Sequence, residues 1–257
     1  MFTLPVIESV AKVQDAIMRR WSRAPDRPIL YLAYRGTGQI FSLGGDLDFY
    51  LDCLRANDRE GLRTYADYAT RVIRLNRTGL DGAVITLSNV RGKAIGGGID
   101  PARACNVMVA EEDATFSYPE VNFNHYPIAA VPVLSRHVGF IEAERILMSG
   151  EEYSAREFLA KGALDDVVPC GAGDDWIRRY AARTMNSHRA RVALFAAFDR
   201  MAGFLDGTLG DCAERWADHI MTLRPVEIAK LQRIAAAQER LLGRMLRAAV
   251  ARVGALS

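Results

Sequence analysis

Long hydrophobic runs are absent from this sequence of 257 residues, in which no apolar stretch approaches the roughly 18 residues that a membrane-spanning helix requires. The N-terminus, MFTLPVIESVAKVQ, lacks the basic start and long apolar stretch of a secretory signal. Half of the residues are hydrophobic and a quarter are charged, as is ordinary for a soluble globular protein. We therefore expect a cytoplasmic protein of one or two domains with no membrane partner.

Closely spaced metal-binding residues are also missing. The four cysteines form no C-x-x-C pair and stand far apart, at Cys53, Cys105, Cys170 and Cys212. This spacing argues against a zinc site and against a disulfide framework. The histidines show no metal-ligand spacing either. His125 could act as an extra base, although a lone histidine in a loop is more often structural. The sequence thus predicts no metal and no redox cofactor.

The formal net charge is only +2, but the charge is unevenly distributed. From Arg178 to the end there are fourteen Arg or Lys residues against seven Asp or Glu residues. A basic C-terminal region could meet an acidic partner, such as a phosphorylated cofactor tail, an acidic carrier protein or RNA. Alternatively, these residues only cover solvent-exposed helix faces of an arginine-rich protein. In that case nucleic acid is an unlikely partner.

Strands and helices alternate along the first two thirds of the chain. Apolar residues at steps of three and four predict amphipathic helices, one from Ile7 to Trp21 and one from Leu62 to Ile73. Short apolar runs predict buried strands at ILYLAY, GAVITLSNV, ACNVMVAEE and ATFSYPEV. The segment SAREFLAKGALDDVVP is interpreted as a short helix and a turn. This alternation predicts an α/β layered fold.

After about residue 170 the pattern becomes helical, so we divide the chain into an α/β core (1–170) and a helical C-terminal module (171–257). The last helix carries an apolar stripe made of Ile228, Leu231, Ile234, Leu241, Met245 and Val253. Such a stripe packs on its own core or on a sister subunit more often than on a membrane.

Two glycine turns directly follow predicted strands, Gly44-Gly45 in FSLGGDL and Gly96–Gly98 in KAIGGGID. Glycine lets the backbone approach a ligand closely and leaves N–H groups free to donate. Two such turns that face one point would form an oxyanion hole. Each turn by itself is more often only a turn. No G-K-[ST] and no G-x-G-x-x-G is present, which disfavours a phosphate loop and a dinucleotide site.

Two acidic residues follow the second turn: Asp100 comes two residues after the glycines, and Glu120 comes in SYPEVNF. If these segments converge, the two carboxyl groups are equipped for acid–base work on water and on a proton beside a carbonyl. Taken alone, Asp100 could be a first-turn helix acid and Glu120 a surface or ion-pair residue.

Together, FSLGGDL, VRGKAIGGGID, YPEV and SAREFLAKGALDDVVP resemble the enoyl-CoA hydratase/isomerase (crotonase) superfamily in order and spacing over residues 28–170. The resemblance implies a ββα spiral core and a homotrimer or hexamer. It also implies that residues 171–257 serve trimerisation and the acyl pocket. Gly45 and Gly97 match the oxyanion-hole positions, and Asp100 and Glu120 match the two catalytic carboxylates. The neighbouring Leu43, Ile95 and Gly96 are expected to contact the substrate.

Within the superfamily, the same motifs resemble the diffusible-signal-factor synthases, together with MVAEE, WADHIM and AAAQER. Those enzymes dehydrate 3-hydroxyacyl thioesters of acyl carrier protein and hydrolyse the thioester to a free cis-2-enoic acid. The resemblance implies that Trp216 helps to wall a long acyl pocket, the alternative being plain helix packing.

Three features depart from the family pattern. Asp100 replaces the usual glutamate and shortens the reach by about 1.5 Å. An aspartate also occurs in the dienoyl-CoA isomerase branch, but that branch has a second aspartate where this chain has Ile128. The stretch PIAAVPV replaces a glycine-rich segment. The chain begins at the family's first helix, so we expect the strand pair that normally precedes it to be trimmed or absent.

The sequence therefore predicts an acyl-thioester lyase whose substrate is carried on coenzyme A or on acyl carrier protein, and which acts as a signal synthase. One alternative is a degradative enoyl-CoA hydratase or isomerase, whose product stays a thioester. Another is a superfamily member without turnover that binds RNA or protein.

Overall fold

The chain winds through two four-stranded sheets. The computed structural model describes residues 1–36, 38–201 and 208–254, without the side chains of residues 246 and 248–254. One sheet has the order β1 (Tyr31–Arg35), β3 (Ile85–Val90), β5 (Val107–Glu111), β8 (Asp166–Val168). The other has the order β2 (Ile40–Ser42), β4 (Lys93–Ile95), β6 (Thr115–Ser117), β7 (Glu152–Ser154).

Successive strands pass from the first sheet to the second, so β1 leads to β2, β3 to β4 and β5 to β6. Every pairing is parallel except that of β6 with β7. All residues of β3 and β5 are buried, because both faces of their sheet are covered. This repeated turn is the predicted ββα spiral, and the α/β fold class is confirmed.

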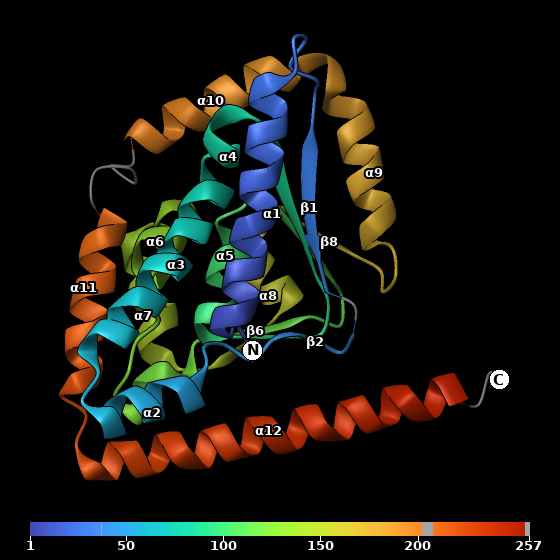
Figure 1. Cartoon of the computed structure of the whole chain (residues 1–257). Helices are drawn as coiled ribbons and strands as arrows, with labels where there is room; N and C mark the ends of the chain where they lie inside the picture. Colours follow the sequence, from blue (N-terminus) through green and yellow to red (C-terminus); the bar gives the residue numbers. More distant parts are fainter. Residues whose placement is uncertain (37, 202–207, 255–257) are drawn as a thin grey trace.

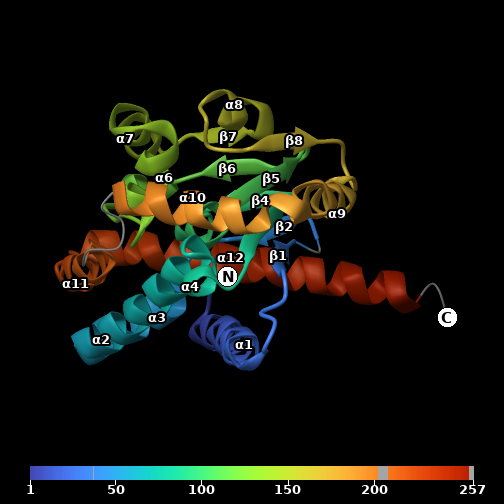
Figure 2. The same cartoon turned by 90° about the horizontal axis from the view of Figure 1, so that it is seen from above.

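The helices enclose the sheets (Figure 1). Figure 2 shows α7 and α8 on one side of the sheets and α1–α3 on the other. In chain order the helices are α1 (Leu4–Arg23), α2 (Leu47–Ala56), α3 (Arg59–Arg77), α4 (Gly79–Gly82), α5 (Asp100–Arg103), α6 (Ala130–Val138), α7 (Phe140–Ser149), α8 (Ala155–Ala160), α9 (Gly173–Thr184), α10 (His188–Met201), α11 (Thr208–Met221) and α12 (Pro225–Gly254). Three 3-10 turns cover Gly96–Gly98, Pro119–Phe123 and Met185–Ser187.

Several short strands differ from the sequence interpretation. The segments FSLGGDL and KAIGGGID were interpreted as turns, but they include residues of β2 and β4. In SAREFLAKGALDDVVP the expected turn contains β8, which pairs in parallel with β5. In ATFSYPEV only Thr115–Ser117 is a strand, because Pro119 opens a 3-10 turn instead of extending the sheet. All these misreadings concern three-residue strands, whose pattern is too short to show a period.

The C-terminal helices pack closely on the core. Trp216 of α11 is fully buried against Tyr50 and Tyr65, which come from α2 and α3. On α12, Leu231 is buried and the other described members of the predicted apolar stripe are partly buried. Val253 lies outside the described side chains. Whether residues 171–257 form a separate module stays a prediction.

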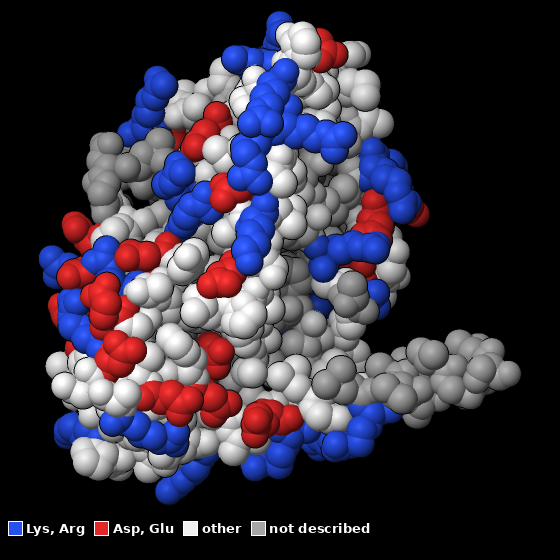
Figure 3. All heavy atoms as spheres, viewed as in Figure 1, with Lys and Arg blue, Asp and Glu red and all other residues white. Residues whose placement is uncertain are grey.

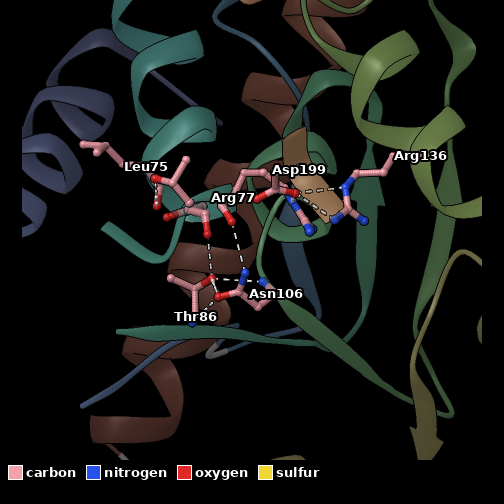
Figure 4. Close-up of polar contacts among 8 residues, drawn as sticks. Leu75, Arg77, Thr86, Asn106, Arg136 and Asp199 are labelled. Carbon is pink, nitrogen blue, oxygen red and sulfur yellow. Dashed lines mark hydrogen bonds and ion pairs between the residues drawn. The ribbon is translucent and has the colours of Figure 1, made fainter. Parts of the chain in front are cut away.

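A buried ion network fastens α10 to the core (Figure 4). Asp199 of α10 accepts hydrogen bonds from Arg77 Nε at 2.6 Å and from Arg136 Nη2 at 2.7 Å. The Asp199 and Arg77 side chains are only 1 % and 2 % exposed. Asn106 donates to the Arg77 carbonyl and accepts from the backbone N–H of Thr86. The network thereby joins α3, α6, α10 and the first sheet.

Candidate active site

A cavity of about 410 Å³ lies between the two glycine turns and α12. Its wall is mostly apolar, with two carboxyl groups and one arginine. The lining residues are Phe2, Leu43, Gly44, Gly45, Leu47, Tyr50, Tyr65, Ala69, Ile73, Ile95, Gly96, Gly97, Asp100, Pro119, Glu120, Phe123, His125, Pro127, Ile128, Trp216, Arg233, Ile234, Ala237, Gln238 and Leu241. Every site residue predicted from the sequence belongs to this one cavity.

The first glycine turn is held from both sides. The Gly44 carbonyl accepts from the Phe2 N–H at 2.8 Å, and Gly44 has φ +90°, which only glycine adopts readily. A Cβ on Gly45 would lie 2.0 Å from the Tyr50 hydroxyl, so a side chain cannot fit there. The Gly45 N–H has no acceptor among the residues that the structure describes. This N–H group is therefore available to a ligand.

The second glycine turn touches the first. A Cβ on Gly98 would lie 2.1 Å from Ser42 Oγ, and one on Gly96, whose φ is +58°, would lie 2.0 Å from Glu120 Oε1. These two positions therefore require glycine. Gly97 differs, because its Cβ would meet only Pro127, at an ordinary 3.7 Å. The sequence predicted that the turns converge, and the contact of Gly98 with Ser42 is how they do so.

Glu120 occupies the donor that we expected to be free. Its Oε1 accepts a hydrogen bond from the Gly97 N–H at 2.9 Å. Its Oε2 is buried and has no hydrogen-bond partner among the described residues. Burial raises the pKa of Glu120 to about 7, although the Gly97 hydrogen bond and another from the Glu120 backbone oppose the rise. Glu120 is thus poised to change protonation state near neutral pH.

Asp100 lies deeper and is held by Tyr118. It opens α5 and is 1 % exposed, and Tyr118 donates from its hydroxyl to Asp100 Oδ1 at 2.9 Å. Burial raises the pKa of Asp100 well above its ordinary value, and the nearby Glu120 adds to the rise. A carboxyl that stays neutral in an apolar cavity can donate a proton.

An aromatic wall closes one side of the cavity. Trp216 meets Tyr50 edge-on, with ring centroids 4.9 Å apart, and lies 5.8 Å from the ring of His125. Burial lowers the pKa of His125 to about 3, and His219 contributes to the shift, so its ring is neutral at physiological pH. Trp216 takes part in both helix packing and the cavity wall, so the two interpretations of this residue are compatible.

Sequence reasoning missed Tyr50 and Tyr118. Tyr118 stands two residues before Glu120 in SYPEV, and a buried tyrosine ordinarily needs a partner for its hydroxyl. That signal could have suggested a pairing with Asp100. Tyr50 gave no comparable signal, because its contact with Gly45 depends on how α2 returns over the first turn.

The described part of the chain has neither a membrane-spanning helix nor a cluster of metal ligands. Over residues 1–36, 38–201 and 208–254, no helix is both long and apolar enough to cross a membrane. Within the same ranges, no group of three or more His, Cys, Asp or Glu side chains is placed to hold a metal ion.

Two buried carboxyl groups lie beside two converging glycine turns, an arrangement that suits acid–base chemistry. The family comparison agrees with such chemistry, because the model of the enoyl-CoA hydratase/isomerase family matches residues 33–204. The chain belongs to this family, and with it to the crotonase superfamily.

Curated relatives agree with this assignment, and a solved structure shares the fold. A probable enoyl-CoA hydratase of Bacillus subtilis is 30% identical over 66% of this chain and 60% of its own length. The mevalonyl-coenzyme A hydratase sidH of Aspergillus fumigatus is 32% identical over 59% and 54%. The chain thus matches little more than half the length of these relatives. The crystal structure of an enoyl-CoA hydratase from Bacillus halodurans superposes with a TM-score of 0.73 at 19% identity, covering 90% of this chain and 89% of that one.

Proposed function

We propose that this chain is an acyl-thioester lyase, which removes water from a 3-hydroxyacyl thioester carried on coenzyme A or acyl carrier protein. We further propose that it hydrolyses the thioester and releases a free 2-enoic acid, as a diffusible-signal-factor synthase does. The observation that carries the proposal is that Asp100, Glu120 and the Gly45 and Gly97 turns line one apolar cavity.

The thioester oxygen binds to the N–H groups of Gly45 and Gly97. To reach Gly97, it displaces Glu120 Oε1, which then loses a hydrogen bond that lowers its pKa. The pKa of Glu120 rises in consequence, and the carboxylate becomes a stronger base for the proton on C2.

Asp100 protonates the hydroxyl that leaves. Glu120 takes the C2 proton and the thioester becomes an enolate held by the two N–H groups. As the C2–C3 double bond forms, the neutral Asp100 carboxyl gives its proton to the 3-hydroxyl, which leaves as water. Tyr118 orients Asp100 through its hydrogen bond at 2.9 Å.

Hydrolysis of the thioester uses the same backbone donors. Water attacks the carbonyl carbon and gives a proton to the Asp100 carboxylate, which the dehydration has left ionised. The tetrahedral oxyanion is stabilised by roughly 2.7–4 kcal/mol per donor. Its collapse breaks the C–S bond, and the departing sulfur takes the proton from Glu120 and leaves as a thiol. Leu43, Ile95 and Trp216 belong to the apolar wall that would receive the acyl chain. Each buried methylene contributes about 0.8 kcal/mol, which favours chains of medium length.

The test is a panel of 3-hydroxyacyl thioesters of increasing chain length. Thiol release is followed with a thiol reagent, while mass spectrometry identifies the acid. We expect free 2-enoic acid from medium chains. Rapid hydration of crotonyl-CoA without thiol release from any chain would refute the signal synthase and leave a hydratase.

A degradative enoyl-CoA hydratase is the second candidate. It is favoured by the names of the two relatives, both of which are called hydratases. Ile128 lines the cavity and is apolar, so it offers no third acid for a dienoyl-CoA isomerase. Such a hydratase needs only Asp100, Glu120 and the two donors, and its product remains a thioester.

We also propose a trimer or a dimer of trimers in the cytoplasm. Large apolar side chains are exposed on two helices, with Phe140 of α7 81 % exposed and Met201 of α10 86 % exposed. Such surface is typical of an interface. Light scattering should give a mass of at least three chains, and a concentration-independent mass of 28.4 kDa would contradict this expectation.

A further inference from the structure

Five exposed cationic side chains follow one face of α12. They recur at steps of three, seven, four and three residues, which at 3.6 residues per turn places them within about 100° of the helix circumference. We name them the basic stripe: Lys230, Arg233, Arg240, Arg244 and Arg247. Among the described side chains, none of the five has a carboxylate within ion-pair distance, and the ion pair on α12 joins Arg224 to Glu227 instead.

The basic stripe borders the cavity. Arg233 belongs both to the stripe and to the cavity wall, and Ala237 and Leu241 extend that wall along α12. Gln238 donates to the Leu43 carbonyl at 2.8 Å, which ties this part of the helix to the first glycine turn. Figure 3 shows Lys and Arg side chains gathered along α12 below the core. An acidic partner on the stripe would therefore lie beside the entrance for the substrate.

The length of the stripe indicates the size of the partner. From Lys230 to Arg247 the helix rises about 26 Å, at 1.5 Å per residue. One nucleotide tail with its few phosphates would cover only a part of this row. An acidic protein surface can meet the whole row, and a partner that delivers a thioester fits its position, because the cavity residues of α12, from Arg233 to Leu241, lie beside the row.

We propose that the basic stripe docks an acidic acyl carrier protein and directs its thioester arm into the cavity. This inference rests on the proposed function, because it names the carrier of that substrate. The adjacent α2, which packs against α12, exposes Asp48 and Asp52. Asp52 pairs with Arg55, whereas Asp48 repels an acidic partner from that side and so orients it along α12.

The experiment compares two triple charge reversals. R240E/R244E/R247E alters the stripe and leaves the cavity residue Arg233 in place. R19E/R20E/R23E is the matched control, because Arg19, Arg20 and Arg23 are exposed near the end of α1, which Figure 1 shows away from α12. Thermal unfolding verifies that both variants fold. Each is assayed with 3-hydroxydecanoyl groups on a purified acyl carrier protein, on coenzyme A and on pantetheine, which carries no phosphate.

We expect the stripe variant to lose about tenfold or more in kcat/KM with the carrier-protein thioester, as steering contributes 10–10³ to association rates. Its activity on the pantetheine thioester should match that of the wild type. The wild-type preference for carrier protein should fall as salt is raised. Equal loss in the two triple variants, or no loss, would overturn the proposal.

Two further results would also overturn it. An equal loss with the coenzyme A thioester would make the stripe a phosphate site and not a protein-docking surface. Binding of RNA in preference to carrier protein would assign the stripe to nucleic acid. Binding of the carrier without an acyl group, measured by fluorescence anisotropy, separates the two proposals. Stripe-dependent binding in a protein that turns over no thioester would uphold the docking surface and refute the proposed function.

Discussion

The cavity and the ion network beneath α10 both bury carboxyl groups, but only the network gives its carboxylate cationic partners. Asp199 lies between Arg77 and Arg136. Asp100 and Glu120 have no cation within ion-pair distance among the described residues, and their hydrogen bonds come from a phenol and from backbone N–H groups. The pKa of each of these two carboxyls is raised by burial.

The difference is the one expected between a structural site and a candidate reactive site. A buried charge with opposite charges beside it stays ionised and holds elements together. Burial without a cation raises the pKa of both cavity carboxyls, and Glu120, with a pKa of about 7, can exchange its proton near neutral pH. Burial also shifts the pKa of the network's cation. Desolvation lowers the pKa of Arg77 to about 10, although Asp199 opposes the shift. Arg77 nevertheless remains charged at neutral pH.

The largest effect is expected from neutralising the cavity carboxyls. If Glu120 and Asp100 transfer the protons, Glu120→Gln and Asp100→Asn should each lower kcat by roughly 10²–10⁴. The measurement is steady-state turnover of the preferred 3-hydroxyacyl thioester. Glu151→Gln, at an exposed carboxyl, is the matched control and should leave kcat unchanged. Intact turnover in Asp100→Asn would favour a single-carboxylate mechanism. Intact turnover in Glu120→Gln would contradict the contrast between a reactive cavity and a structural ion network.

The next effect concerns the network. Asp199→Ala leaves two guanidinium groups without their shared carboxylate, and the loss should destabilise the fold by about 3–5 kcal/mol. Urea unfolding followed by circular dichroism gives the free energy of unfolding. Asp174→Ala breaks the exposed pair with Arg35, which is 61 % exposed, and should cost less than about 1 kcal/mol. An Asp199→Ala protein no less stable than Asp174→Ala would show that the network does not fasten α10.

These two sites also differ in how far the sequence predicts them. The predicted oxyanion-hole and carboxyl residues come from three motifs, FSLGGDL, KAIGGGID and YPEV. The resemblance of these motifs to the superfamily predicted that Asp100 and Glu120 lie beside two glycine turns. The strand alternation predicted the α/β layered fold, and the family resemblance predicted its spiral form. The pattern of residues within a motif is local, so it can be recognised without knowing the fold.

Contacts between distant segments could not be predicted in this way. Arg77 and Asp199 stand 122 residues apart, and nothing in either segment indicates the other. The hydrogen bond from Gly97 to Glu120 was missed for the same reason, because it depends on how the 3-10 turn at Pro119–Phe123 packs against the second glycine turn. Burial, which shifts the pKa of Glu120, is also a property of the packed fold and not of the motif.

The smallest expected effect tests the cavity through stability instead of catalysis. The folded pKa of Glu120, about 7, is above its ordinary value of 4.5, so the folded state binds this proton more tightly than the unfolded state. Stability from this group is therefore fully present below pH 4.5 and is lost as the pH rises through 7. Glu120→Gln cannot ionise, and relative to the wild type it should gain up to about 3 kcal/mol between pH 4.5 and pH 8.5.

The change with pH, and not the absolute stability, decides this prediction. Glu120 Oε2 has no partner among the described residues, so the amide that Glu120→Gln introduces would bury an unpaired donor at a cost of roughly 1–3 kcal/mol at every pH. The variant and the wild type are compared by their free energies of unfolding at each pH. The cost is the same at both pH values, so it cancels when one comparison is subtracted from the other. Urea unfolding of both proteins at pH 4.5 and pH 8.5 supplies the four free energies, and Glu151→Gln repeats the comparison at an exposed carboxyl. A difference that is the same at both pH values would mean that Glu120 is not held in the raised-pKa state, and the contrast between the cavity and the ion network would then lose its physical basis.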